Sequence, residues 1–283
     1  MSSAHPPAWL EGLFAVIPTP MRAGGAVDLD GLARVVDHYL AHGARGVVPA
    51  SIAGEGHLLS TEEQRAVLDC VVRHCAGRAP VLLGVLGESV AEAAELARAA
   101  MGQGASGLLL KPPHGPEAQV LDHIGMVAQA APVPLVLIDH PRFGASPSPA
   151  LLHTLTQQLP QVCGVKLEAE PTPAKMAAVR ALLGPRLRIF GGLGALHGLD
   201  ELTHGADGFF TGHPQPQHLV ELIHCFRAGD AAGARAAYAA LLPVAEWERD
   251  HPQAMVASRK THLRALGVID EAFTRLPRPP EGG

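Results

Sequence analysis

Residues 103–110 read QGASGLLL, and closely related stretches stand at 42–48, HGARGVV, and at 204–210, HGADGFF. Each stretch has a glycine suited to ending a helix, then a short turn, then an apolar run of strand length. Such a recurring unit indicates that helix and strand follow one another repeatedly along the chain.

Eight apolar runs flanked by turn residues are predicted to be strands, at 13–17, 46–49, 81–85, 107–110, 135–138, 162–167, 187–190 and 208–211. The segments between them have the 3.6-residue periodicity of helices. Eight such units in about 250 residues favour a (β/α)8 TIM barrel. The alternative, a doubly wound open sheet, usually has fewer strands and a phosphate loop after the first strand. Here the first strand ends in IPTP, which is no such loop.

The chain continues past the eighth strand with more helical periodicity than a barrel requires. We therefore expect an N-terminal segment over 1–11, the barrel over 12–228, a C-terminal helical extension over 229–276 and a disordered tail over 277–283. No low-complexity linker separates the barrel from the extension.

The charge and cysteine content restrict the partners. The formal net charge is −5 and basic residues form no run, which argues against nucleic acid and against anionic membranes. The four cysteines have no CxxC spacing and lie in apolar segments, as buried thiols of a reducing compartment do. The first residues have no signal-peptide pattern. We expect a cytoplasmic protein that acts on a small molecule.

Only four lysines occur in the chain, and Lys166 is the one whose position predicts chemistry. Alternation along the sixth strand puts Gly164, Lys166 and Glu168 on one face and Cys163 and Val165 on the other. If the first face points into the barrel, burial favours the neutral amine, which condenses with a ketone to a Schiff base. The alternative is a structural ion pair between Lys166 and Glu168.

The other three lysines are predicted to have no catalytic role. Lys111 precedes two prolines in a loop that should be exposed, and Lys175 and Lys260 fall on surface-like helical stretches.

A metal site is not expected, although the chain has 16 histidines. His57, His114, His140 and His213 follow strands, but the first strand, LFAVIPTP, offers no ligand and no His-x-His occurs among the early strands. A metal-dependent aldolase on the same fold is the least favoured reading, and no cofactor is expected. The loop FGGLGALHG, at 190–198, offers backbone N–H groups to an anion, or is simply a tight turn.

Several motifs together resemble the dihydrodipicolinate synthase / N-acetylneuraminate lyase family of class I Schiff-base lyases. They are FAVIPTP, VDLDGL, GARGVVPASIAGEGHLLSTEE, GRAPVLLGV, IDHP, GVKLE, FGGLGALHGLDEL and HGADGFFTG. The resemblance implies a TIM barrel with a C-terminal helical region, a homo-oligomer (dimer or tetramer), and Lys166 as the Schiff-base lysine.

The chain departs from the family pattern at four places. Residues 51–55, SIAGE, replace the family's Gly-Thr-Thr-Gly-Glu loop, so both threonine hydroxyls are missing. Ile138 stands in place of the catalytic tyrosine, Phe143 in place of the substrate-binding arginine, and His114 in place of the strand-four tyrosine. General acid–base help is worth roughly 10²–10⁴-fold, so the name-giving synthase activity, 4-hydroxy-tetrahydrodipicolinate synthesis, is disfavoured.

No other phenol replaces the missing tyrosine in this reading, because Tyr39 and Tyr238 are expected in helices distant from the strand ends. The run Asp139-His140-Pro141 and the run Lys166-Leu167-Glu168 are similar to the L-2-keto-3-deoxyarabonate dehydratase-like subgroup. A dehydratase needs a base at C3 of the imine and an acid for the leaving hydroxyl.

The sequence thus predicts a cofactor-free lyase, an aldolase or dehydratase, acting on a pyruvate-derived or 2-keto-3-deoxy sugar acid. The alternative is a catalytically impaired member that binds 2-oxo acids or has a regulatory role. The expected catalytic residues are Lys166, Glu168, Asp139 and His140. The expected substrate-binding residues are Ser51, Ala53, Gly54, Glu55, His114, Ile138, Phe143, Gly192 and Phe210.

Overall fold

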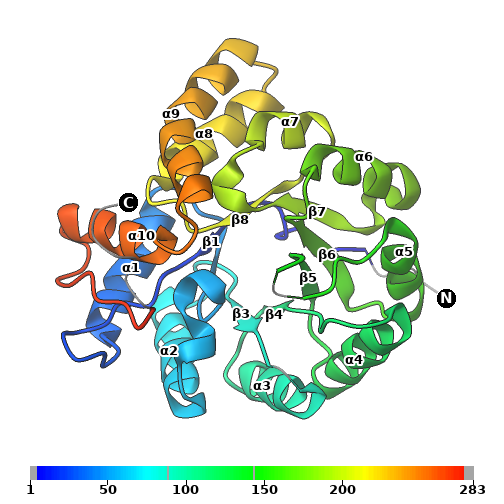
Figure 1. The fold of residues 1–283 in the computed structure, drawn as a ribbon, viewed down its shortest axis with the longest axis horizontal. Helices are drawn as coiled ribbons and strands as arrows, with labels where there is room; N and C mark the ends of the chain where they lie inside the picture. Colours follow the sequence, from blue (N-terminus) through cyan, green and yellow to red (C-terminus); the bar gives the residue numbers. More distant parts are fainter. Residues whose placement is uncertain (1–4, 88, 143, 277–283) are drawn as a thin grey trace.

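The computed structural model describes residues 5–87, 89–142 and 144–276, and shows a ring of parallel strands surrounded by helices (Figure 1). The strands are β1 Gly12–Val16, β2 Gly46–Val48, β3 Leu82–Val85, β4 Gly107–Leu110, β5 Leu135–Asp139, β6 Val162–Leu167, β7 Arg188–Gly191 and β8 Gly208–Thr211. The α-helices are α1 Leu29–Ala41, α2 Thr61–Cys75, α3 Val90–Gly102, α4 Glu117–Ala130, α5 Pro149–Gln158, α6 Thr172–Leu183, α7 Gly198–Thr203, α8 Pro216–Arg227, α9 Ala231–Asp250 and α10 Met255–Ala265.

The sheet runs in the order β2-β1-β8-β7-β6-β5-β4-β3, with every neighbouring pair parallel. A parallel bridge between Val47 and Val81 joins the two ends of the sheet and closes the ring. The expected (β/α)8 barrel is therefore confirmed.

Two apolar layers hold the barrel together. Inside the ring, Phe210 stacks on Phe14 at a centroid separation of 4.8 Å and meets Phe190 edge-on at 4.6 Å. Outside the ring, alternate strand residues such as Leu135 and Leu137 pack against the helices. All these side chains are buried, so the barrel interior is a packed core.

The strand-6 prediction is right for Lys166 and wrong for Cys163. The register of β5 and β6 shifts between Leu135 and Val136, so that Leu135 pairs with Val162 but Val136 pairs with Gly164. This irregularity turns the Cys163 side chain into the barrel interior instead of toward the helices.

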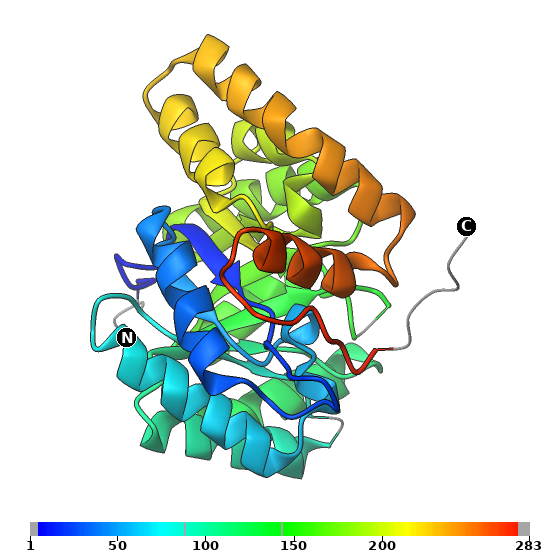
Figure 2. The same cartoon turned by 90° about the vertical axis from the view of Figure 1, so that its left-hand side faces the viewer.

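The C-terminal helices extend the barrel on one side. Helix α9 packs along α8, and α10 with the segment after it lies beside α1 (Figure 2). The guanidinium Nε of Arg34 in α1 donates to the carbonyl of Val268 at 2.8 Å. Met255, at the start of α10, packs against the interior cluster, which places this helix over the barrel.

Candidate active site

Lys166 and Glu168 form the centre of the site at the carboxyl end of β6. The Lys166 Nζ lies 2.9 Å from the Glu168 Oε1, and their side chains are 12% and 7% exposed. Burial alone would raise the pKa of the Glu168 carboxyl, but Lys166, the His140 ring and the Leu193 N–H together hold it below its usual value. Because its pKa is low, Glu168 is ionised, and an ionised carboxylate beside Lys166 has a site free to accept a proton from it.

The loop after β7 fits tightly around Glu168. The Leu193 N–H donates to the Glu168 Oε1 at 3.0 Å. Leu193 and Ala195 both have positive φ, at 47° and 62°, which is uncommon for residues with a Cβ. Backbone strain of this kind is typical of functional sites, where surrounding contacts hold it in place.

Gly192 should not tolerate a side chain, because a Cβ there would collide with the Glu168 carboxyl group. We expect Gly192→Ala to push Glu168 away from Lys166 and to cost about 1–3 kcal/mol of stability. Gly102→Ala is the matched control, since a Cβ at this helical position meets no atom within 4 Å. Thermal unfolding of both variants measures the difference; equal melting temperatures would contradict the tight fit.

His140 lies with the lysine and carboxylate, whereas Asp139 does not. The charges of Glu168 and Lys166 both act on the His140 ring, although burial is the larger effect and lowers its pKa. Asp139 is fully buried on the helix-facing side of β5, where its Oδ2 lies 2.9 Å from the Nζ of Lys175. The catalytic role expected for Asp139 is therefore not supported, and Lys175 is a partly buried ion-pair partner of Asp139.

The loop after β2 faces the end of the barrel with its backbone groups. Ser51 and Ala53 are 2% and 7% exposed, and the Gly54 carbonyl accepts the Thr19 hydroxyl at 2.6 Å. Ala53 packs with the interior cluster. The structure therefore brings this loop, by its backbone, to the same end of the barrel as Lys166.

Glu55 points away from the barrel interior. Its carboxylate pairs with Lys260 and accepts the Thr274 hydroxyl at 2.6 Å and the Arg275 N–H at 2.8 Å. Both Glu55 and Lys260 are fully buried. The substrate-binding role expected for Glu55 is thus not supported, and the prediction that Lys260 lies on a surface is wrong.

The remaining predicted contacts are scattered. Ile138 pairs with Lys166 in register and points into the barrel, and Phe210 lies fully buried in the interior stack. Phe143 lies outside the described residues.

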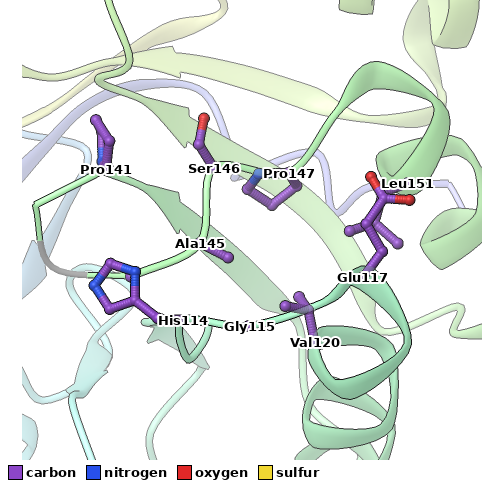
Figure 3. A pocket seen from close by; sticks show the side chains of 10 residues that line it. His114, Gly115, Glu117, Val120, Pro141, Ala145, Ser146, Pro147 and Leu151 are labelled. Carbon is purple, nitrogen blue, oxygen red and sulfur yellow. The ribbon is translucent and has the colours of Figure 1, made fainter.

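His114 is exposed and lines a cavity of about 280 Å³ between the loops after β4 and β5. Figure 3 shows His114 and Pro141 at one end of this cavity and Glu117 and Leu151 at the other. Lys166 is not among the residues that line it.

Arg259 and Glu248 form a buried pair that the sequence interpretation missed. The Arg259 Nε and Nη2 donate to the two Glu248 oxygens at 2.7 and 2.6 Å, and the residues are 3% and 6% exposed. A Cβ on Gly212, just after β8, would lie 2.9 Å from the Arg259 Nη1. A guanidinium therefore sits over the end of β8, and its charge is balanced by Glu248.

Tyr39 also reaches a strand end, contrary to expectation. Its hydroxyl donates to the carbonyl of Gly212 at 3.0 Å, immediately after β8. Burial raises the pKa of this phenol above its ordinary value. The Tyr238 hydroxyl donates to the Leu196 carbonyl. Both phenols are thus engaged by main-chain carbonyls.

Within residues 5–87, 89–142 and 144–276, no three His, Cys, Asp or Glu side chains are grouped as metal ligands. The same part of the chain contains no helix long and apolar enough to cross a membrane.

A parallel eight-stranded barrel with a lysine–carboxylate pair at the carboxyl end of β6 defines a class of barrel enzymes whose sites lie at this face. Residues 9–281 match the model of the dihydrodipicolinate synthetase family, and the chain belongs to that family. Membership supports a lyase, of the aldolase or dehydratase kind.

The relatives have two different names. The chain is 34% identical over 280 residues to a 4-hydroxy-tetrahydrodipicolinate synthase of Sorangium cellulosum, covering 96% of this chain and 91% of the relative. It is 28% identical to an L-2-keto-3-deoxyarabonate dehydratase of Azospirillum brasilense, covering 95% and 88%. The crystal structure of YagE of Escherichia coli K12, in complex with pyruvate, superposes with a TM-score of 0.87 at 25% identity, covering 96% and 94%.

Proposed function

We propose that this protein forms a Schiff base between Lys166 and a 2-oxo acid and then cleaves or dehydrates the bound acid. The observation that carries the proposal is the buried contact of 2.9 Å between the Lys166 Nζ and the Glu168 Oε1 at the end of β6. Membership of a family with a pyruvate-bound structure supports a 2-oxo acid as the substrate.

Imine formation needs a proton acceptor first and a proton donor later. Glu168 takes a proton from the Lys166 ammonium, and the free amine attacks the C2 carbonyl of the acid. One proton then passes from the new nitrogen centre to the former carbonyl oxygen, which gives the neutral carbinolamine. The carbinolamine hydroxyl then leaves as water when Glu168 returns the proton. One carboxylate beside the amine can perform both transfers, because it starts ionised.

The next step is removal of a proton or of a carbon group at C3 of the imine. We propose Glu168 and His140 for these proton transfers; Glu168 lies 2.9 Å from the Lys166 Nζ, and the charges of Lys166 and Glu168 both act on the His140 ring. For dehydration, a base removes the C3 proton to give an enamine, and an acid protonates the departing hydroxyl. We propose the Ser51–Gly54 loop, Ile138, Gly192 and His114 as substrate contacts.

Pyruvate tests the proposal without knowledge of the natural substrate. Borohydride should reduce the imine to a stable secondary amine on Lys166, detected by mass spectrometry of the peptide. In D2O the same imine should exchange the C3 protons of pyruvate for deuterium, which proton NMR follows. A panel of 2-keto-3-deoxy sugar acids, with the synthase substrates included, then separates dehydration, cleavage and synthesis. No adduct with any of these acids would overturn the proposal.

Glu168→Gln should slow the C3 exchange of pyruvate by roughly 10²–10⁴-fold, because an amide cannot accept the proton. Glu170→Gln is the matched control: Glu170 is exposed and pairs with His197 at 2.9 Å. NMR exchange rates of both variants provide the measurement. If the exchange rate of Glu168→Gln is unchanged, the ion pair between Glu168 and Lys166 has only a structural role.

A second candidate function is binding of 2-oxo acids without turnover. It is favoured by the two tyrosines, whose hydroxyls are both held by main-chain carbonyls. In that case pyruvate should bind Lys166→Ala as tightly as the wild type, and neither protein should exchange the C3 protons. Calorimetry with both proteins distinguishes the two functions.

We further propose that the chain works in the cytoplasm as a homo-oligomer, a dimer or tetramer, without nucleic-acid or membrane partners. The family resemblance supports the assembly, and the absence of a basic run in the sequence supports the choice of partners. Size-exclusion chromatography with light scattering measures the assembly directly.

A further inference from the structure

Glu201, in α7, is a buried carboxyl group that the proposed chemistry does not use. It is 1% exposed, and its Oε1 accepts the Thr172 hydroxyl at 2.6 Å. Within the described part of the chain, its Oε2 has no hydrogen-bond partner and neither oxygen lies in an ion pair. A carboxylate would be costly in such a place.

Glu201 and Glu168 pack against consecutive glycines at the end of β7. A Cβ on Gly191 would collide with the Glu201 Oε2, and a Cβ on Gly192 would collide with the Glu168 Oε1. Because successive Cβ positions of a strand point to opposite faces, the two carboxyl groups lie on either side of the same strand end. The strand end is therefore all that separates Glu201 from the Lys166–Glu168 pair.

In the part of the chain that the structure describes, the side chains that act on Glu201 include no cation. The groups that act on it are Thr172 from α6, Glu168 after β6 and Asp200 from its own helix. From α9, Tyr238 is affected by Glu201, and its hydroxyl donates to a main-chain carbonyl. Burial raises the pKa of Glu201 to about 8, and the two acidic neighbours act in the same direction.

Building on the proposed function, we propose that Glu201 is a positioning residue that controls the Lys166–Glu168 pair by being a neutral acid when the enzyme works. A neutral Glu201 adds no second negative charge across the strand end, so Lys166 loses its proton more easily. An ionised Glu201 would raise the proton affinity of both members of the pair, and would keep Lys166 as an ammonium ion to higher pH.

The pH profile of adduct formation tests this role. We compare Glu201→Gln with the wild type by the rate of borohydride trapping of pyruvate on Lys166. The profiles should coincide below about pH 7. Above about pH 8, where wild-type Glu201 ionises, the midpoint of the rise should lie at lower pH in the variant than in the wild type. Glu95→Gln removes an exposed acid that pairs with Arg65 on the surface, far from α7, and should leave the profile unchanged.

Thermal unfolding provides a readout that needs no activity. The folded chain keeps on Glu201 a proton that the unfolded chain releases, so wild-type stability falls as pH rises from about 4.5 to about 8. Glu201→Gln has no such proton to retain. The melting temperature of the variant should therefore rise relative to that of the wild type as pH increases across that window. A melting difference that is constant with pH would overturn the neutral acid.

The two assays also separate this inference from the proposed function. If the wild type forms no adduct at any pH, the Schiff-base function fails while the melting comparison still reports the state of Glu201. If adducts form and the trapping profiles of wild type and Glu201→Gln coincide, the positioning role is wrong even where melting shows a neutral acid.

Discussion

Lys166→Ala should abolish the borohydride-trapped pyruvate adduct and slow C3 exchange by at least about 10³-fold. The side chain supplies the nitrogen of the imine, and no other amine lies beside Glu168 in the described residues. Mass spectrometry of the trapped protein and NMR exchange rates measure both effects.

Lys166→Arg separates the charge of this residue from its nucleophilicity. Arginine keeps a cation beside Glu168 but stays protonated, so it forms no imine. We therefore expect Lys166→Arg to fold with a melting temperature near that of the wild type and to form no adduct. Lys111→Ala, which changes a half-buried lysine at the end of β4, should keep the adduct. An adduct found on Lys111 instead of Lys166 would contradict the assignment.

Lys260→Met should destabilise the fold by about 3–5 kcal/mol, because it leaves the buried Glu55 carboxylate without its cation. Arg65→Met is the control: Arg65 pairs with Glu95 at 3.3 Å on the surface, where an ion pair is worth about 1 kcal/mol or less. Chemical unfolding of both variants, compared with the wild type, measures the two losses.

The pH dependence of that loss identifies its cause. Lys260 and the surrounding donors hold the pKa of Glu55 below its usual value against the effect of burial. The stabilisation is therefore complete above the unfolded pKa of about 4.3 and is lost as pH falls through the folded pKa. The deficit of Lys260→Met should narrow at about pH 4 compared with about pH 7. An equal deficit at both would point to lost packing of the lysine methylenes.

Periodicity and repetition were enough to predict the barrel, because every strand is a short apolar run with turn residues around it. Lys166 was predictable for the same reason, since alternation resumes after Gly164. Cys163 was not, because the register shift at Val136 depends on how two strands pair and not on either sequence alone.

The prediction that Lys260 of α10 lies on a surface was wrong, although the sequence carries a signal of its burial. Val256, Arg259, Lys260 and Leu263 are its buried residues, and they follow the spacing of one helical face. A lysine and an arginine on one helix face are normally taken to be exposed to solvent. Burial becomes the better prediction only when a buried acidic partner is known. Glu55 lies 205 residues from Lys260, and Glu248 lies 11 residues from Arg259 in the preceding helix, so both pairings depend on how the helices and the loop after β2 pack together.

The attachment of Glu55 has a consequence for the order in which the protein is completed. The loop after β2 is translated early, but the partners of Glu55 lie 205 and 219 residues further along the chain. Contacts of such long range form late in folding. A growing chain on the ribosome therefore holds an unfinished loop after β2 until α10 and the segment that follows it emerge, and loss of residues 273–276 by proteolysis would leave Glu55 with Lys260 but without the Thr274 and Arg275 donors.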